Sequence, residues 1–329
     1  MLRYNPLLNT YTMVAANRQN RPNMPQGWCP FCIGSGKVPD EGYTVLMYPN
    51  DFPALSPQAN EVLDTPLPNS PYQAEQSLGH CEVILYSPDH HASLHDLSLP
   101  HLEELIALWQ NRHQVMAADT SVKYIFIFEN RGEAVGVTMP HPHGQIYGYP
   151  FVPLKLVTQL QNCKTYYDTH QRPLLADMLA TELADGRRLI FENTHFVAYI
   201  PYFTDYPYGV MIQARRHLNY LSDFNAEETR AFAEILKAVT GGMDKLFDTR
   251  FPYMMCFHQN PVNTPEWEGH EVYFSFHVEF YTPWRAKNVI KYYASSETGA
   301  WAAANTRLVE ETAPELRQAI QDFMQGKEG

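Results

Sequence analysis

An internal repeat constrains the fold more than any other feature of the sequence. The segment that starts at Cys81 (CEVILYSPDHHASLHDLSLPHLEELIALW) and the segment that starts at Tyr208 (YGVMIQARRHLNYLSDFNAEETRAFAEILKAV) share one order: a strand-like run, a turn around a histidine, and a helix-like run. Two strand-like runs follow each helix, at 122–130 and 141–150 and again at 251–261 and 273–283. The sequence therefore predicts two similar α+β units, each an antiparallel sheet with a long helix on one face, joined near 155–185 into one compact body.

Each repeated helix has a start signal and an apolar stripe. Ser98 is the expected N-cap of the first helix, whose stripe is Leu102, Leu105, Ile106 and Trp109. Asn225, with Glu228 in the capping-box position, is expected to begin the second, whose stripe is Phe232, Ile235, Leu236 and Val239. A third amphipathic helix is predicted to start at Thr312, with a stripe of Leu316, Ala319, Ile320 and Phe323.

Composition excludes several classes of protein. With 329 residues, 45% of them apolar, the chain can bury one large core or two ordinary ones and is not disordered. The formal net charge of −12 argues against a broad basic face that binds nucleic acid or anionic membrane, so any phosphate must be held locally. Apolar runs such as 122–128 are too short to span a bilayer, and the first residues do not resemble a signal peptide, so we expect a cytoplasmic protein.

The cysteines indicate a metal site more than a disulfide framework. Their number is five, and only Cys29 and Cys32 are close in sequence. The C-x-x-C spacing allows two thiolates to occupy two corners of a zinc tetrahedron. His141 and one of His90 and His91 are candidates for the other two corners of a closed, structural site. The alternative is a pair of core or redox cysteines, although a thioredoxin-like site lacks its βαβ surroundings here.

The strongest local signal is the segment HPHGQ, from His141 to Gln145. If it is a strand, His141, His143 and Gln145 project from one face, and Pro142 and Gly144 point away. Buried histidines need partners, which metal ligation or phosphate chemistry would supply. The alternative is a solvated edge strand, which the proline permits.

Two other chemical patterns are rejected. The segment GSGK at 34–37 is not a phosphate loop, because Phe31 stands where that loop needs glycine and Val38 where it needs Ser or Thr. The serines show neither a nucleophile elbow nor the spacing of a catalytic triad. A histidine is therefore the best candidate for a nucleophile.

Together the motifs HPHGQ, CPFC, SPDH, YPNDFPALSP and FENRGEAVG resemble the galactose-1-phosphate uridylyltransferase family of the histidine-triad superfamily. The resemblance extends from about Arg18 to the C-terminal helix. It implies an α+β fold of two fused histidine-triad-like halves: 1–155 with a zinc site and the catalytic strand, and 156–329 as a degenerate repeat. In the second half Glu279 takes the place of His143.

The resemblance implies an enzyme with a covalent intermediate. The nucleophile of the family corresponds to His143, which would attack the α-phosphorus of UDP-glucose, expel glucose 1-phosphate and form a uridylyl-histidine. Galactose 1-phosphate would then take the uridylyl group to give UDP-galactose, with ping-pong kinetics. Gln145 would donate to a non-bridging phosphoryl oxygen. By the same resemblance, a structural zinc ion falls on Cys29, Cys32, His90 and His141.

The resemblance also implies a set of substrate-binding residues. The nucleoside contacts are Asn50, Asp51 and Phe52, for which the alternative is an Asx turn that begins a strand. The contacts to phosphates are Arg18, Arg21, Asn130, Gly136 and Thr138. Lys291 and Glu297 match hexose contacts that the family donates across a dimer interface. For the four charged residues Arg18, Arg21, Lys291 and Glu297 the alternative is ordinary surface charge.

The sequence departs from the family pattern at two places. Many members bind a second metal, usually iron, through one Glu and three His, and the matching positions here are Gln159, His258, His277 and Glu279. Two of the four differ, so we expect that site to be altered or empty, with His258 and His277 as hydrogen-bonded core histidines. The hexose-binding glutamine of the family has no counterpart in register after Glu297, which leaves the acceptor sugar open.

The leading hypothesis is a homodimeric uridylyltransferase that acts on UDP-glucose and a hexose 1-phosphate, with no nucleic-acid or membrane partner. One alternative keeps the covalent histidine but passes the adenylyl group of ADP-glucose or a diadenosine polyphosphate to inorganic phosphate. Another is a non-catalytic, zinc-stabilised sensor of sugar nucleotides. Covalent labelling of the histidine separates the enzymes from the sensor, and comparison of UDP-glucose with ADP-glucose separates the two enzymes.

Overall fold

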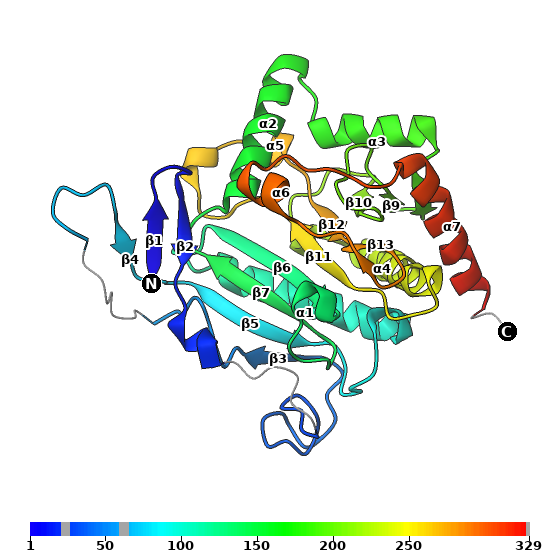
Figure 1. The fold of residues 1–329 in the computed structure, drawn as a ribbon, viewed down its shortest axis with the longest axis horizontal. Coiled ribbons are helices and arrows are strands. Elements are labelled where there is room, and N and C mark those ends of the chain that lie inside the picture. The colour runs from blue at the N-terminus through cyan, green and yellow to red at the C-terminus, as the bar shows by residue number, and fades with distance from the viewer. Residues whose placement is uncertain (21–26, 59–65, 327–329) are drawn as a thin grey trace.

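A computed structural model describes residues 1–20, 27–58 and 66–326 of the chain. Its central feature is one antiparallel sheet with the strand order β3-β5-β7-β6-β11-β12-β10-β9-β8 (Figure 1). The strands are β3 (Leu46–Pro49), β5 (His80–Leu85), β6 (Tyr124–Arg131), β7 (His143–Tyr149), β8 (Leu189–Glu192), β9 (Phe196–Tyr199), β10 (Val210–Ala214), β11 (Tyr253–His258) and β12 (His277–Tyr281).

The repeat explains this strand order. The first copy contributes the neighbouring strands β5, β7 and β6. The second copy contributes the corresponding strands β10, β12 and β11 in the reverse order across the sheet, and the two copies meet where β6 pairs with β11. The register there runs from Tyr253 opposite Arg131 to Cys256 opposite Phe128. The predicted α+β class with two similar antiparallel units is confirmed, and the two sheets are joined edge to edge as one.

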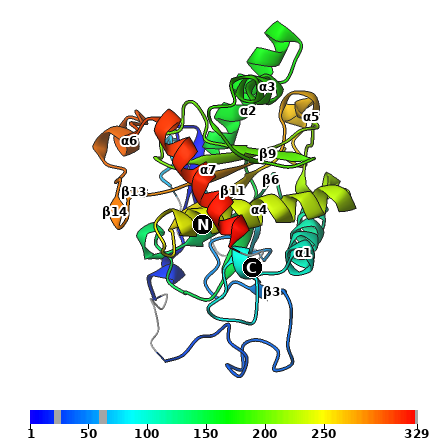
Figure 2. The same cartoon turned by 90° about the vertical axis from the view of Figure 1, so that its right-hand side faces the viewer.

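The two repeated helices pack on the same face of the sheet. They are α1 (Leu99–Ala117) and α4 (Ala226–Leu246), and they also contact each other (Figure 2). Both predicted caps are confirmed: the Ser98 side chain accepts a hydrogen bond from the backbone N–H of His101, and Asn225 forms a capping box with Glu228. The predicted stripes are buried and form the largest hydrophobic core of the described residues.

The C-terminal helix begins earlier than expected. α7 runs over Val309–Gln325 and lies against α4 and β8, so the predicted start at Thr312 is wrong by three residues. Val309, Thr312 and Ala313 are buried, so tertiary packing extends the helix towards its N-terminus. Pro314 lies inside the helix, where it removes one backbone donor.

Two helices that the sequence analysis did not predict connect the copies. α2 (Leu154–His170) packs on the face of the sheet opposite α1, where Leu156 and Leu160 contact Tyr124, and α3 (Leu174–Asp185) packs on β9 and β10. The remaining elements are β1 (Leu2–Asn5), β2 (Thr10–Met13), β4 (Ala74–Glu75), β13 (Trp284–Ala286), β14 (Val289–Ile290), α5 (His270–Tyr273), α6 (Ser295–Gly299) and five short 3-10 helices. Among the described residues, no helix combines the length and apolar character that crossing a membrane requires.

Candidate active site

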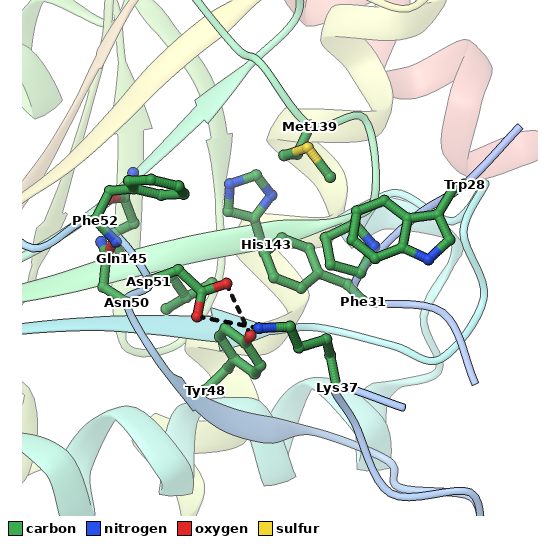
Figure 3. Close-up of a pocket in the computed structure, with 12 residues that line it drawn as sticks. Trp28, Phe31, Lys37, Tyr48, Asn50, Asp51, Phe52, Met139, His143 and Gln145 are labelled. Atoms are coloured by element: carbon green, nitrogen blue, oxygen red, sulfur yellow. Dashed lines mark hydrogen bonds and ion pairs between the residues drawn. The ribbon is translucent and has the colours of Figure 1, made fainter. Parts of the chain in front are cut away.

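A cavity of about 360 Å³ opens on the face of the sheet opposite α1, at the start of β7 (Figure 3). It lies between β7, the turn after β3 and the irregular segment 28–37. Its lining residues are Trp28, Pro30, Phe31, Lys37, Tyr48, Asn50, Asp51, Phe52, Val83, Met139, His143 and Gln145.

His143 is the first residue of β7, and its ring forms part of the cavity wall. The Nδ1 atom lies 2.8 Å from the carbonyl oxygen of His141, a contact that requires an N–H at Nδ1. In the neutral imidazole the lone pair therefore lies on Nε2. The predicted strand start at His141 is wrong by two residues, because Pro142 has no N–H to give to the ladder. His143 and Gln145 line this cavity, whereas His141 does not.

Gly144 lets β7 lie close to a buried tyrosine. A Cβ atom at Gly144 would be only 2.1 Å from the hydroxyl oxygen of Tyr86, which is 1% exposed. A side chain at this position would have to displace the Tyr86 ring or shift β7. The glycine of HPHGQ therefore permits the close packing of β7 against Tyr86.

A short hydrogen-bond chain orients Gln145. Its Oε1 atom accepts a hydrogen bond of 3.0 Å from the Tyr147 hydroxyl, which accepts in turn from Arg18 at 2.5 Å. Arg18 also donates to the carbonyl oxygen of Phe52 at 3.1 Å. Because Oε1 already accepts this hydrogen bond, the Gln145 amide can bind a further group through its N–H donors. Sequence reasoning missed Tyr147, although its position two residues after Gln145 places both on one face of the strand.

The turn after β3 supplies Asp51, whose carboxylate is the only one among the described residues that line the cavity. Asn50 Oδ1 accepts a hydrogen bond of 2.9 Å from the backbone N–H of Phe52, so this is an Asx turn, and it follows a strand instead of beginning one. Asp51 accepts a hydrogen bond of 2.9 Å from the hydroxyl of Tyr48. The ammonium of Lys37 lies 3.7 Å from the other Asp51 oxygen. Lys37, from the rejected phosphate-loop segment, was not predicted to lie here.

Asn130 and His143 both line a second cavity, of about 230 Å³, to which Arg131 and Arg250 also contribute. Gly136 has a φ of 78° and lies in an exposed turn, and Thr138 has a buried hydroxyl without a hydrogen-bond partner among the described residues. Neither of these two lines the cavities at His143. Arg21 lies outside the described residues.

Lys291 and Glu297 lie next to each other but apart from the cavities at His143. The Lys291 ammonium is 3.9 Å from a carboxylate oxygen of Glu297 and 4.4 Å from the ring centroid of Tyr293. Neither residue lines the cavities that contain His143. Within this chain, then, the structure does not bring the expected hexose contacts to the expected nucleophile.

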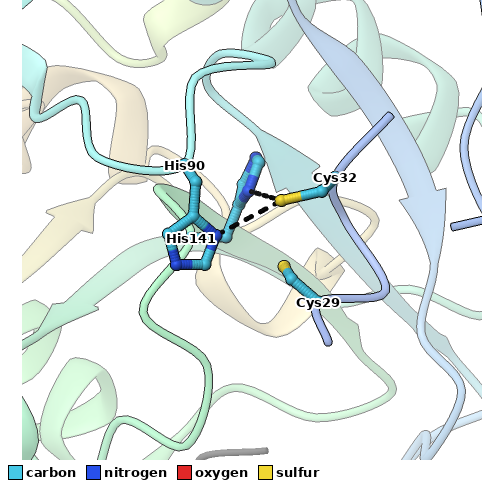
Figure 4. Close-up of side chains that lie close together, drawn as sticks. All are labelled: Cys29, Cys32, His90 and His141. Atoms are coloured by element: carbon cyan, nitrogen blue, oxygen red, sulfur yellow. Dashed lines mark hydrogen bonds between the residues drawn. The ribbon is translucent and has the colours of Figure 1, made fainter. Parts of the chain in front are cut away.

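The four residues expected to bind zinc converge beside the active site (Figure 4). One ligand atom from each lies within 4.8 Å of the other three, an arrangement that could hold a metal ion: Cys29, Cys32, His90 and His141. Cys32 Sγ is 3.3 Å from Nδ1 of His90 and 3.6 Å from Nδ1 of His141. Two sulfurs and two imidazole nitrogens are a tetrahedral donor set that zinc prefers.

The surroundings of His141 also fit a metal ligand. Its Nε2 atom lies 2.8 Å from the carbonyl oxygen of Ser87, so the Nδ1 lone pair is directed towards Cys32. Burial lowers the pKa of His141 to about 4, which keeps the imidazole neutral. Burial and the neighbouring Cys29 raise the pKa of the Cys32 thiol to about 11, so a cation is needed to hold the Cys32 sulfur as a thiolate.

A second group of possible ligands lies on β11 and β12. Ligand atoms of His258, His277 and Glu279 are within 4.8 Å of one another. His258 Nδ1 is 2.9 Å from Gln159 Oε1, and His277 Nδ1 is 3.0 Å from the carbonyl oxygen of Ser275. Both imidazoles are buried and hydrogen-bonded.

Known proteins of one family are similar to this chain over almost its whole length. Residues 29–153 match the family described as the N-terminal domain of galactose-1-phosphate uridyl transferase, and residues 159–324 match its C-terminal domain. The galactose-1-phosphate uridylyltransferase of Thermotoga maritima is 39% identical over 96% of this chain and 98% of its own. That of Haemophilus influenzae is 31% identical over 85% of this chain and 83% of its own. A solved structure of a uridylyltransferase superposes with a TM-score of 0.88, at 29% identity and 98% coverage of both chains. The chain therefore belongs to the galactose-1-phosphate uridylyltransferase family.

Proposed function

We propose that this protein transfers UMP from UDP-glucose to galactose 1-phosphate, and thus acts in galactose metabolism. The observation that carries the proposal is the position of His143 between the two cavities, with Nδ1 held by a backbone carbonyl and the lone pair on Nε2. Family membership supports the same reaction, and it does not favour the adenylyl-transferring alternative.

The reaction proceeds in two in-line steps at Nε2. First, Nε2 of His143 attacks the α-phosphorus, a P–N bond forms, and the bond from the α-phosphorus to the bridging oxygen breaks to release glucose 1-phosphate. Then a phosphate oxygen of galactose 1-phosphate attacks the same phosphorus, the P–N bond breaks, and the electron pair returns to Nε2. Throughout, Nδ1–H keeps its bond to the His141 carbonyl, which stabilises the positive charge of the uridylylated ring.

The other active-site residues bind and orient the substrate. Gln145, held by Tyr147, donates to a non-bridging oxygen of the α-phosphate as charge develops there. Asp51 accepts from ribose hydroxyls, while Asn50 and Phe52 form the rest of the nucleoside site. Phosphate contacts are assigned to Arg18, which bonds to Tyr147 and Phe52, and to Asn130, which lines the second cavity with His143. For Arg21, Gly136 and Thr138 the assignment rests on the family resemblance alone.

We assign a structural zinc ion to Cys29, Cys32, His90 and His141. With four protein ligands the site is closed, and the ion would supply rigidity, not Lewis-acid chemistry. His141 would connect the two sites, because its side chain is a ligand and its carbonyl oxygen holds His143. The same ion would fix Cys29 and Cys32, and with them the cavity residues Trp28 and Phe31.

We further propose a homodimer in which Lys291 and Glu297 of one subunit complete the hexose site of the other. Their separation from His143 within one chain supports this, as do exposed aromatic residues beside Lys291, of which Tyr292 is 73% exposed. The division into 1–155 and 156–329 is likewise a proposal, supported by the repeat. A cytoplasmic location is supported by the five cysteines, none of which forms a disulfide bond.

The intact mass of the purified protein tests the function. We expect UDP-glucose to add the mass of one uridylyl group per chain, and galactose 1-phosphate to remove it. An adduct formed with ADP-glucose and discharged by inorganic phosphate would instead assign the phosphorylase reaction. If neither nucleotide leaves an adduct, the covalent mechanism is wrong and the sensor hypothesis replaces it. Other hexose 1-phosphates in the second step identify the acceptor sugar.

A further inference from the structure

The carboxylate of Glu279 lies at the centre of a side-chain cluster outside the active site. It projects from β12 on the same face of the sheet as Gln145 and contacts the first turns of α2. Only 13% of the side chain is exposed. The partners come from three elements: Lys155 and Gln159 of α2, His258 of β11, and His277 and Tyr281 of β12.

Both oxygens of this carboxylate already have donors. Oε2 accepts from the ammonium of Lys155 at 2.9 Å and also from the Tyr281 hydroxyl. Oε1 accepts from the amide nitrogen of Gln159 at 3.1 Å. The Lys155 ammonium also donates to the Tyr281 hydroxyl and lies 4.4 Å from the centroid of that ring. One cation is therefore bound between the carboxylate and the phenol.

The Gln159 amide and the imidazoles of His258 and His277 also have hydrogen-bond partners. Gln159 uses its oxygen to accept from His258 Nδ1 at 2.9 Å while its nitrogen donates to Glu279. His258 Nε2 lies 3.3 Å from the Tyr281 hydroxyl, and His277 Nδ1 donates to the Ser275 carbonyl. His277 Nε2 is 3.3 Å from Glu279 Oε1.

These residues do not fit the second metal ion of the family. To bind a metal, Glu279 would have to release Lys155, and Gln159 would have to give up its bonds to His258 and Glu279. Of the described residues that contact the cluster, Glu279 alone is acidic, so a divalent ion beside the ammonium would leave excess positive charge at a nearly buried position. A neutral amide is also a weaker ligand than the carboxylate that it replaces.

We propose that the ammonium of Lys155 is the resident cation of this cluster and takes the place of the second metal ion. The chain would then hold one metal ion per subunit, at Cys29, Cys32, His90 and His141. Because α2 links the two copies of the repeat, the Lys155–Glu279 pair also anchors the connecting helix to β12. This inference is independent of the reaction catalysed at His143.

Elemental analysis of the purified full-length protein tests the metal content. We expect one metal equivalent per chain in the wild type and the same value in Glu279→Gln. Two equivalents in the wild type, one of which is lost in Glu279→Gln, would overturn the proposal. This measurement does not depend on activity.

Thermal unfolding tests the role of the ammonium. The Lys155 side chain is 54% exposed, so Lys155→Met is expected to fold, but its Tm should fall because the Glu279 carboxylate loses its cation. Adding Glu279→Gln to that variant should restore much of the loss. Lys164→Met is the matched control, since it removes an exposed ion pair with Asp168 from the same helix and should leave Tm unchanged. An unchanged Tm in Lys155→Met would refute the proposed role of the ammonium.

Discussion

At the scale of single residues, the link between His141 and His143 joins the proposed metal site to the proposed nucleophile. The side chain of His141 faces Cys32, and its carbonyl oxygen accepts from Nδ1 of His143. The tautomer of the nucleophile is thus set by backbone geometry, which side-chain substitutions elsewhere leave in place.

Replacing His143 by Ala should reduce uridylyl transfer by about 10⁴-fold or more, because it removes the imidazole that is proposed to form the covalent intermediate. Initial rates and the mass of the protein after incubation with UDP-glucose measure this. Gln145→Ala should keep the covalent adduct but slow its formation by about 10²–10³-fold, the usual loss of a transition-state donor. Substantial turnover by His143→Ala, with Tm and metal content unchanged, would refute the assignment.

A buried carboxyl next to the active site should make stability depend on pH. Burial raises the pKa of Glu129 to about 7, from 4.5 when unfolded. The groups that face Glu129 are Tyr253, whose hydroxyl is 3.3 Å away, together with Tyr86, Arg131, Asp244 and Arg250. A raised carboxyl pKa means that the folded state binds the proton more tightly than the unfolded state. The contribution of Glu129 to the free energy of unfolding is therefore greatest below pH 4.5 and is lost as pH rises to about 7.

Glu129→Gln should therefore flatten the stability profile over this range and unfold at a higher Tm than the wild type at pH 8. The effect should be on the order of 1–3 kcal/mol, since each pKa unit corresponds to about 1.4 kcal/mol. Thermal melts between pH 5 and pH 8 measure it. The exposed control, Glu133→Gln, should follow the wild type. Parallel profiles for wild type and Glu129→Gln would contradict the assignment.

At the scale of secondary structure, glycines determine how closely α7 approaches α4. A Cβ atom at Gly242 would lie 2.2 Å from Cγ1 and 3.0 Å from Cα of Ile320. Gly242→Ala should therefore lower stability by about 1–2 kcal/mol, even though alanine favours a helix by about 1 kcal/mol. Chemical denaturation measures this change. Gly299→Ala, where no atom lies within 4 Å, should stay within about 0.5 kcal/mol. A more stable Gly242→Ala would show that α7 can move away without cost.

The irregular segment that carries Cys29 and Cys32 should depend on the metal for its position. It supplies Trp28 and Phe31 to the cavity wall. Removing the ion with a chelator should lower Tm and raise KM for UDP-glucose by ~10-fold, the factor that about 1.4 kcal/mol of lost binding gives. Kinetics before and after re-addition of zinc measure both. Cys163→Ala, at a buried cysteine of α2, should keep its metal. Full affinity in the metal-free protein would contradict this role.

At the scale of the whole molecule, the joined sheet makes the two copies one folding unit. β6 and β11 are hydrogen-bonded neighbours, α1 contacts α4, and one hydrophobic core contains residues of both copies. Calorimetry should therefore show a single transition, because neither copy can unfold without exposing the core of the other. Fragments 1–155 and 156–329 should not fold when produced separately. Two resolved transitions would contradict this expectation.

Much of this architecture could be predicted from the sequence. Ser98 and Asn225 begin the two repeated helices as expected, and the strands after each helix lie within one to four residues of their predicted limits. The HPHGQ and CPFC motifs identified the family and the residues that converge in the structure. These features can be predicted from the sequence because helix caps, the apolar stripes of helices and the alternation of strands depend on residues only two to four positions apart.

Contacts between distant segments were decided only by the tertiary structure. The sequence did not show that β6 pairs with β11, that α2 covers the Glu279 cluster, or that Lys37 lies near Asp51. Lys155 and Glu279 are 124 positions apart, and nothing local to either residue identifies the other. Local sequence patterns reflect interactions between residues that are close in the chain, whereas contacts between remote residues depend on how whole helices and strands pack. The sequence by itself therefore determined the repeated strands and helices and the chemistry of the proposed nucleophile, and the packing of the elements decided which charges meet.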